Sequence, residues 1–216
     1  MSSRSHLVSL LQNLETNSLD KDLIDMNFFD DNGLFAASEK VTIRELRVGD
    51  SEDYYNLQKD LELVGDILER SKRVNGLLST PPLSNANNLH LAIEDNQSGK
   101  MIGYMMLKNL DSETPEIGID LLSGYRNRGL GYECVGLLIK HAVKIAGYKS
   151  FLVKIYSDNH ASLALFQKFN ISKMGEEDSI YDLILEVADA IEDHEDGENY
   201  YSSNHQKKIL KFILTM

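Results

Sequence analysis

The residues with the clearest chemical potential form a short turn, Arg126–Gly131 (RNRGLG), which runs directly into a stretch with an apolar stripe. Arg126, Gly129 and Gly131 fill the pattern R/Q-x-x-G-x-G/A. Small residues at these places let main-chain N–H groups converge on an anion, and the positive end of a following helix adds to the attraction. The turn therefore predicts a pyrophosphate site. The alternative is a plain glycine loop whose arginines are solvated.

Two other glycine-rich phosphate loops fit this turn poorly. A Walker A loop needs Lys and then Ser or Thr at the helix start, where this chain has Tyr132 and Glu133, so an NTPase is excluded. A dinucleotide fingerprint would need a third glycine at position 134, where Cys134 stands. The residues SGYRNR also separate the preceding strand from the glycines, where that fold has a tight turn.

Three elements must position the turn. The segment PEIGIDLL predicts a strand, Tyr132–Ala146 predicts a helix, and SFLVKIY predicts a buried strand. The apolar face of the helix consists of Val135, Leu138, Ile139, Ala142 and Ala146. Gly147 stands at its C-terminal end, as a helix cap would. A strand–helix–strand unit of this kind is parallel and right-handed.

The rest of the chain completes an α/β (α+β) domain with a mixed sheet. A helical region opens at Gly49 and Asp50, with an apolar stripe that includes Leu57 and Leu61, and ends in the loop at Pro81 and Pro82. The segments LHLAIED, NQSGK and MIGYMMLK predict a β-hairpin. Three further elements are the strand VTIREL, a helix from Asn159 through Phe169, and the late strand YDLILEV.

The chain divides into three parts. Residues 1–40 predict an N-terminal arm with a short helix, and residues 41–187 predict the main domain. Residues 188–216 predict an acidic linker followed by a basic amphipathic segment, HQKKILKFILTM, that could dock as a terminal helix.

Composition narrows the class of protein. The 216 residues carry a formal net charge of −12, which repels phosphate backbones, so we expect no nucleic acid partner. The single cysteine, Cys134, rules out an intrachain disulfide, and the six histidines lack ligand spacing, so we expect no metal. No signal peptide and no apolar run of about 20 residues is evident. We therefore expect a soluble, cytoplasmic protein without a membrane span.

Two segments in this order, EIGIDLLSGYRNRGLGYECVGLLIKHAV and VKIYSDNHASLALFQKFNISKMG, resemble the GNAT superfamily of N-acetyltransferases over roughly Val41–Val187. The resemblance is nearest to the branch of ribosomal-protein N-terminal acetyltransferases. It implies a mixed, mostly antiparallel central sheet with a parallel βαβ crossover and helices on both faces. It also implies that the strands before and after the long helix splay apart around acetyl-CoA.

The resemblance also assigns cofactor contacts. Main chain of Ile119, Leu121 and Leu122 would pair with the pantetheine arm of acetyl-CoA, and an N–H there would polarise the thioester carbonyl. Asn159 would contact the pantetheine or a bridging water, with Ser162 one turn later, although Asn159 also reads as a plain helix N-cap. The pyrophosphate would lie in the turn, on Arg126, Arg128, Gly129, Leu130, Gly131 and Tyr132.

Acetyl transfer to an amine needs a neutral nucleophile and hence a base. Alternation along PEIGIDLL places Glu116, Gly118 and Asp120 on one face of the strand, opposite the apolar set. Glu116 matches the family's glutamate and is the first candidate for general base. The alternative is a carboxylate that only orients substrate or pairs with an arginine. Asp120, nearer the expected thioester, is the reserve.

One departure from the family pattern concerns the leaving thiolate. The tyrosine that often protonates it is replaced by Phe166, so water, Tyr156 or Tyr181 would have to substitute. Asn170 in place of a glycine is a lesser departure. Cys134 reads as a buried structural residue, which disfavours a covalent route.

The predicted function is acetyl transfer from acetyl-CoA to a primary amine by direct attack in a ternary complex. The alternatives are a non-catalytic acyl-CoA-binding regulatory module and a dinucleotide-dependent oxidoreductase, which would bind NAD(P) better than CoA. Polyamines, aminoglycosides, lysines and protein N-termini all suit the acidic chain as acceptors. The arm and the tail either cover the acceptor site or form a homodimer.

Overall fold

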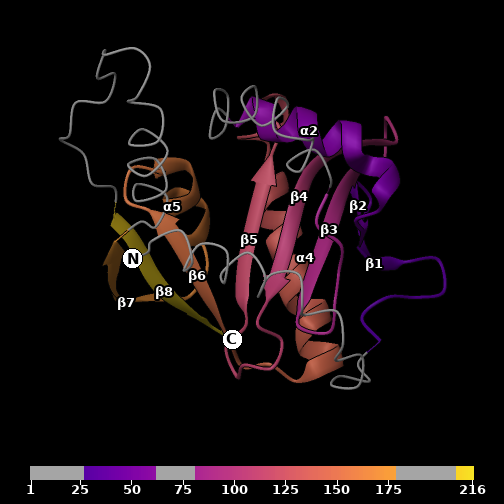
Figure 1. Cartoon of the computed structure of the whole chain (residues 1–216). Coiled ribbons are helices and arrows are strands. Elements are labelled where there is room, and N and C mark those ends of the chain that lie inside the picture. The colour runs from indigo at the N-terminus through magenta and orange to yellow at the C-terminus, as the bar shows by residue number, and fades with distance from the viewer. Residues whose placement is uncertain (1–26, 62–80, 179–207) are drawn as a thin grey trace, which may run out of the picture.

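The computed structural model of the chain describes residues 27–61, 81–178 and 208–216. These residues build one eight-stranded sheet, with helices against both of its faces (Figure 1). The predicted N-terminal helix, the second half of the helical region after Leu61, the strand YDLILEV and the acidic run lie outside the described residues.

The strand order in the sheet is β1-β2-β3-β4-β5-β6-β8-β7. All neighbouring strands are antiparallel except β5 and β6, which are parallel. This topology confirms the predicted mixed, mostly antiparallel sheet with one parallel crossover. The strands are β1 Leu34–Ala37, β2 Val41–Glu45, β3 Asn88–Asp95, β4 Lys100–Lys108, β5 Glu116–Leu121, β6 Ser150–Tyr156, β7 Ile171–Asp178 and β8 Lys208–Thr215.

The long helix α4 (Leu130–Ala146) joins β5 to β6 and covers one face of the sheet. It begins two residues earlier than predicted and ends at Gly147, whose φ of 72° and N–H bond to the Val143 carbonyl close the helix. Its apolar stripe lies against the strands in the main core, which includes Ile43, Leu91 and Ile117. The buried residues of the helix are Leu130, Cys134, Val135, Leu138, Ile139 and Ala142.

The opposite face of the sheet holds a smaller apolar cluster beneath helix α2 (Ser51–Asp60). Leu57 of α2 is 1% exposed there, and Tyr54 packs against the cluster from the same helix. Alternation along β4 serves both faces, because Met105 belongs to the main core while Tyr104 belongs to the smaller cluster.

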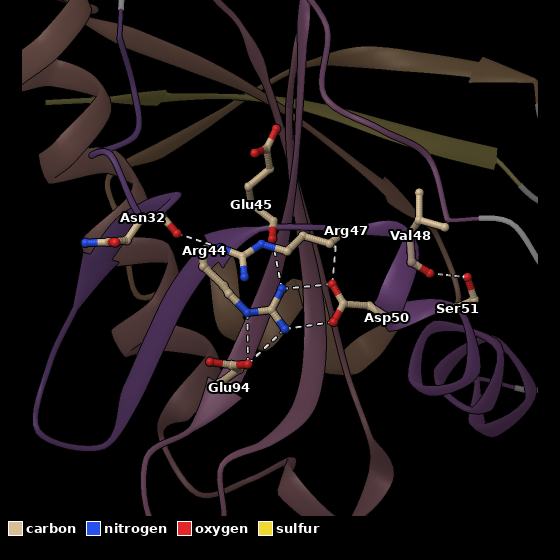
Figure 2. Close-up of polar contacts among 8 residues, drawn as sticks. All are labelled: Asn32, Arg44, Glu45, Arg47, Val48, Asp50, Ser51 and Glu94. Atoms are coloured by element: carbon tan, nitrogen blue, oxygen red, sulfur yellow. Dashed lines mark hydrogen bonds and ion pairs between the residues drawn. The ribbon is translucent and has the colours of Figure 1, made fainter.

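The start of α2 is held to the sheet by the Arg44 guanidinium, which lies between Asp50 and Glu94 (Figure 2). It donates two hydrogen bonds of 2.8 Å to Asp50, at the end of the 3-10 turn η1 (Val48–Asp50), and one of 2.8 Å to Glu94 on β3. Burial alone would raise the pKa of Asp50, but hydrogen bonds from Arg44 and the Arg47 N–H lower it. The ionised carboxylate therefore fixes where α2 leaves the sheet.

The C-terminal segment differs from its prediction. Instead of a terminal helix it forms β8, which lies between β6 and β7 and pairs with both. A strand with partners on both sides and apolar residues on both faces reads as a continuous apolar run, which periodicity alone cannot distinguish from a helix.

Two other elements depart from the sequence-based expectation. Strand β7 was not predicted, because its sequence ISKMGEED is polar, as suits a strand at the edge of a sheet. Helix α5 (His160–Phe166) ends three residues before the predicted Phe169. The domain boundaries at 40/41 and 187/188 stay predictions, although β1 and β8, on their outer sides, both pair with the sheet.

Within the described ranges, none of the helices is sufficiently long and apolar to span a membrane.

Candidate active site

Strands β5 and β6 separate soon after they begin. They pair only at Glu116 with Leu152 and at Ile117 with Val153. Beyond Ile117, β5 continues along β4 as far as Leu121, while β6 turns away toward β8 (Figure 1). One edge of β5 is therefore released by β6 over its second half, as the resemblance implied.

The main-chain groups of β5 alternate between β4 and this separation. The Leu122 N–H donates a hydrogen bond to the Ile102 carbonyl on β4 at 3.0 Å. By alternation, the main-chain N–H and carbonyl of Asp120 also point toward β4, whereas those of Ile119 and Leu121 point away from it. The Leu121 carbonyl indeed accepts a hydrogen bond from Arg126 Nε at 2.8 Å. Both main-chain groups of Leu122 are occupied, since its carbonyl accepts from the Tyr125 N–H at 2.8 Å.

The turn after β5 ends on a helix start whose N–H groups are open. Asn127 and Gly129 adopt left-handed conformations with φ of 60° and 81°, and Gly129 is the N-cap of α4. The first helical bond runs from the Glu133 N–H to the Gly129 carbonyl. Among the described residues, the N–H groups from Gly129 to Tyr132 have no hydrogen-bond partner. With the dipole of a 17-residue helix behind them, these groups can bind an anion.

The charged side chains of the turn do not block this site. Arg126 turns back toward the strand and its Nη2 lies 3.4 Å from Asp60 Oδ2, while the Arg128 guanidinium lies 5.3 Å from the Tyr125 ring centroid. Glu133, the acidic residue of the first turn, lies 3.6 Å from Lys40 Nζ. Repulsion of an anion by Glu133 is thereby reduced.

Gly131 lets α4 approach α5 closely. A β-carbon on Gly131 would lie 3.3 Å from Leu165 Cδ2, closer than most such contacts. Tyr132, in the next position, is 47% exposed and lies with its ring 4.7 Å from that of Phe169. The first turn of α4 is therefore packed on one side and open along its N–H groups.

Asn159 is the N-cap of α5, which is one of the two roles predicted for it. Its Oδ1 accepts the Ser162 N–H at 3.0 Å. This bond joins the two residues that the resemblance placed near the pantetheine, at the end of β6 that lies away from β5.

Glu116 lies at the start of β5, where this strand still pairs with β6, and it has a cation beside it. Lys154 Nζ on β6 lies 3.7 Å from Glu116 Oε2 and 2.9 Å from Glu177 Oε1 on β7. A hydrogen bond with Glu177 raises the pKa of Lys154, with Glu116 as a further contribution. The predicted pairing partner of Glu116 was an arginine, and the structure places a lysine there.

Asp120 lies on the same face, directly across from Tyr104 of β4. Its carboxylate has no hydrogen bond or ion pair to any described residue. Burial raises the pKa of this carboxyl, and the charge of Arg126 offsets the effect in part.

Three side chains that lie on the same side of the sheet as Tyr104 and Asp120, or pack against it, are not among the predicted site residues: Tyr54, His90 and Tyr104. His90 Nδ1 lies 2.5 Å from the Tyr104 hydroxyl, and the Tyr54 ring of α2 lies edge-on to Tyr104 at 5.4 Å. Burial, with the charge of Lys108, lowers the pKa of His90 to about 4, so its imidazole is neutral at pH 7. Alternation within the hairpin could have placed His90 and Tyr104 on one face, but their approach to Asp120 depends on strand register.

Two expectations about the chemistry, one for Phe166 and one for Cys134, can be compared with the packing. Phe166 is 3% exposed within the main core, so no phenol lies at that position. Cys134 is fully buried, and burial raises the pKa of its thiol to about 12, which opposes a thiolate nucleophile. In the described parts of the chain, no three His, Cys, Asp or Glu side chains gather as a metal-binding group.

Comparison with solved structures identifies the same fold. The ribosomal L7/L12 alpha-N-protein acetyltransferase RimL is 14% identical with a TM-score of 0.59, over 85% of this chain and 94% of its own. The spermidine N-acetyltransferase from Vibrio cholerae, in complex with CoA and spermine, is 12% identical with a TM-score of 0.55, over 82% and 96%. An acetyltransferase (GNAT family) from Bacillus anthracis is 14% identical with a TM-score of 0.55, over 83% and 97%.

Comparison of sequences gives the family. No curated protein sequence matches this chain. The family model for the acetyltransferase (GNAT) domain matches residues 40–171, which include the open helix start and the separating strands. This chain therefore belongs to the GNAT family of acetyltransferases.

Proposed function

We propose that this protein transfers an acetyl group from acetyl-CoA to a primary amine of a small molecule, a protein N-terminus or a lysine. The observation that carries the proposal is the row of N–H groups from Gly129 to Tyr132, which lack partners in the described part of the chain at the start of α4. They lie next to the strand edge that β6 leaves open. A diphosphate with an extended arm fits both features.

The residues present fit acetyl-CoA as the co-substrate. The N–H groups of Gly129, Leu130, Gly131 and Tyr132, next to Arg128, would hold the pyrophosphate, and a β-carbon at Gly129 would meet no atom within 4 Å, so the approach to the loop is open. Arg126 contributes by holding the loop to the strand, since its guanidinium is turned inward.

The open edge of β5 would bind the rest of the co-substrate. The main-chain groups of Ile119 and the N–H of Leu121 would pair with the amide-bearing arm, with Asn159 and Ser162 on the far side of the separation. The Leu121 carbonyl is already bonded to Arg126. Leu122 is left out of this role because both of its main-chain groups are occupied. An N–H donor beside the thioester carbonyl would stabilise the oxyanion that forms during transfer.

The acceptor amine must lose a proton before it can attack. An incoming ammonium group would find a counter-charge at Asp120, which has no cation bonded to it among the described residues, whereas Glu116 already has Lys154. We therefore assign Asp120 as the general base and keep Glu116 as the second candidate. Attack then proceeds directly within a ternary complex, since Cys134 is buried away from this face.

A non-catalytic acyl-CoA-binding module is the competing function, and one observation favours it. Phe166 is buried where the family often has a phenol that protonates the leaving thiolate. Of the two tyrosines considered as substitutes, Tyr156 ends β6, and Tyr181 lies outside the described residues.

Two measurements test the proposal in sequence. Isothermal titration with acetyl-CoA should show binding, and a thiol-release assay across polyamines, aminoglycosides and N-terminal or lysyl peptides should show turnover on at least one amine. Binding with no turnover on any amine would favour the regulatory module. Absence of acetyl-CoA binding would refute the loop assignment. The cytoplasmic location and the homodimer stay predictions.

A further inference from the structure

Asp60 stands at an unfavourable place for a carboxylate. It is the last residue of α2, where the carbonyl ends of the helix already carry partial negative charge. A negative charge at the C-terminal end of a helix indicates that another interaction compensates for it. That interaction is found in a different part of the chain.

The compensation comes from the turn between β5 and α4. Ser123 donates its N–H to Asp60 Oδ2 at 2.6 Å and its hydroxyl to Oδ1 at 2.7 Å, and Arg126 Nη2 lies 3.4 Å from Oδ2. Hydrogen bonds from the Ser123 side chain and N–H lower the pKa of Asp60, so its carboxylate stays ionised at neutral pH. These contacts join Asp60 to two residues that lie 63 and 66 positions later in the chain.

The same contacts lead on to the site proposed for the co-substrate. Arg126 donates Nε to the Leu121 carbonyl at 2.8 Å, so its guanidinium bridges the end of α2 and the open end of β5. Six residues earlier in α2, the ring of Tyr54 packs edge-on against that of Tyr104, and Tyr104 lies directly opposite Asp120 in the sheet. One helix therefore contacts both the loop, through Asp60, and the side of the sheet around Asp120, the proposed acceptor face, through Tyr54. Helix α2 lies beyond the end of β5 (Figure 1).

We propose that Asp60 is a positioning residue that couples the pyrophosphate loop to α2, so that CoA bound in the loop steadies α2 over the acceptor face. The inference rests on the proposed function, because it requires CoA in that loop. Asp60 itself touches neither substrate. Its effect would pass through Ser123 and Arg126, which are held between the two elements.

Hydrogen–deuterium exchange of the full chain with and without CoA tests this coupling. In the wild type, CoA should slow exchange both in the loop at 123–132 and in α2. In Asp60→Ala the loop should remain protected by CoA while the CoA-dependent protection of α2 is lost. The affinity for CoA should fall about fivefold or more, at the lower end of typical coupling between sites.

Two further variants keep the test decisive. Asp60→Asn retains an oxygen for Ser123 but loses the charge opposite Arg126, so it should show an intermediate effect even if Asp60→Ala folds poorly. Asp53→Ala, an exposed carboxylate in the first turn of the same helix, should leave both protections unchanged.

The outcomes separate this inference from the proposed function. If the wild type binds CoA but α2 keeps its CoA-dependent protection in Asp60→Ala, the coupling is refuted while the acetyltransferase proposal stands. The same holds if CoA protects only the loop in the wild type. If the wild type does not bind CoA, both proposals fall together.

Discussion

Gly129 occupies the point at which the turn becomes helix α4, with a φ of 81° that residues other than glycine adopt only with strain. A β-carbon there would meet no atom within 4 Å, so a side chain would extend into the space assigned to the pyrophosphate. We expect Gly129→Asp to weaken acetyl-CoA binding about 100-fold or more, because two charges about 4 Å apart near a protein surface repel by several kcal/mol. Isothermal titration measures this directly.

Gly99 offers a matched control for that variant. It also has a positive φ, of 66°, and open space around its β-carbon position, but it lies in the turn between β3 and β4. Gly99→Asp should cost a similar amount of folding stability and leave acetyl-CoA affinity unchanged. Equal loss of affinity in both variants would mean that general destabilisation, rather than the loop, explains the result.

Asp120 should show a conflict between stability and activity. Burial raises the pKa of its carboxyl in the folded protein, so the ionised form costs folding free energy at neutral pH. The stability contributed by Asp120 is complete below its unfolded pKa of about 3.9 and is lost as the pH rises through the folded value. We expect Asp120→Asn to raise Tm at pH 7 but not at pH 3, while lowering turnover by about 10²–10⁴-fold.

Glu116→Gln distinguishes the two carboxylates. It removes one of the two negative partners of Lys154 but leaves Asp120 in place. If Asp120 is the base, Glu116→Gln should preserve the acidic limb of the pH–rate profile, and Asp120→Asn should abolish it. The reverse pattern would return the role to Glu116.

At the scale of elements, β4 and β5 approach each other closely at Gly103. A β-carbon on Gly103 would lie 2.5 Å from the Asp120 carbonyl and 2.6 Å from Leu121 Cδ2. Because main chain cannot move aside as a flexible side chain can, we expect Gly103→Ala to destabilise the fold by about 1–3 kcal/mol. Urea denaturation measures the change.

Gly136 provides the opposite case within α4. It lies in the interior of the helix, and a β-carbon there would meet no atom within 4 Å. Gly136→Ala should therefore stabilise the protein by about 0.5–1 kcal/mol, through the higher helix propensity of alanine. A loss of stability in this variant would show that the helix surface near position 136 is less open than described.

The elements that the sequence predicts well are those with a local signal. Helix α4 has a clear apolar stripe and a terminal glycine, and the hairpin of β3 and β4 has alternating residues around NQSGK. Strand β8 has no such local signal, because KILKFILT is apolar on both faces and takes its partners from β6 and β7. Tertiary pairing decided its conformation.

At the scale of the molecule, the two halves of the proposed site also differ in how well the sequence predicts them. The pyrophosphate loop is contiguous in sequence, so residues 126–132 could be recognised together. The proposed acceptor face combines Tyr54, His90, Tyr104 and Asp120 from one helix and three strands. Their meeting depends on strand register and on where α2 crosses the sheet, neither of which a single sequence specifies.

The C-terminal strand makes the fold depend on residues far apart in the chain. Leu214 of β8 is 2% exposed and lies opposite both Phe151 of β6 and Ile171 of β7. Removing its side chain would leave a cavity between these strands, so we expect Leu214→Ala to lower the free energy of unfolding by about 2–5 kcal/mol. Met216, two residues later and 67% exposed, should tolerate alanine within about 0.5 kcal/mol. If both variants unfold at the same urea concentration as the wild type, β8 is not a buried strand of this sheet.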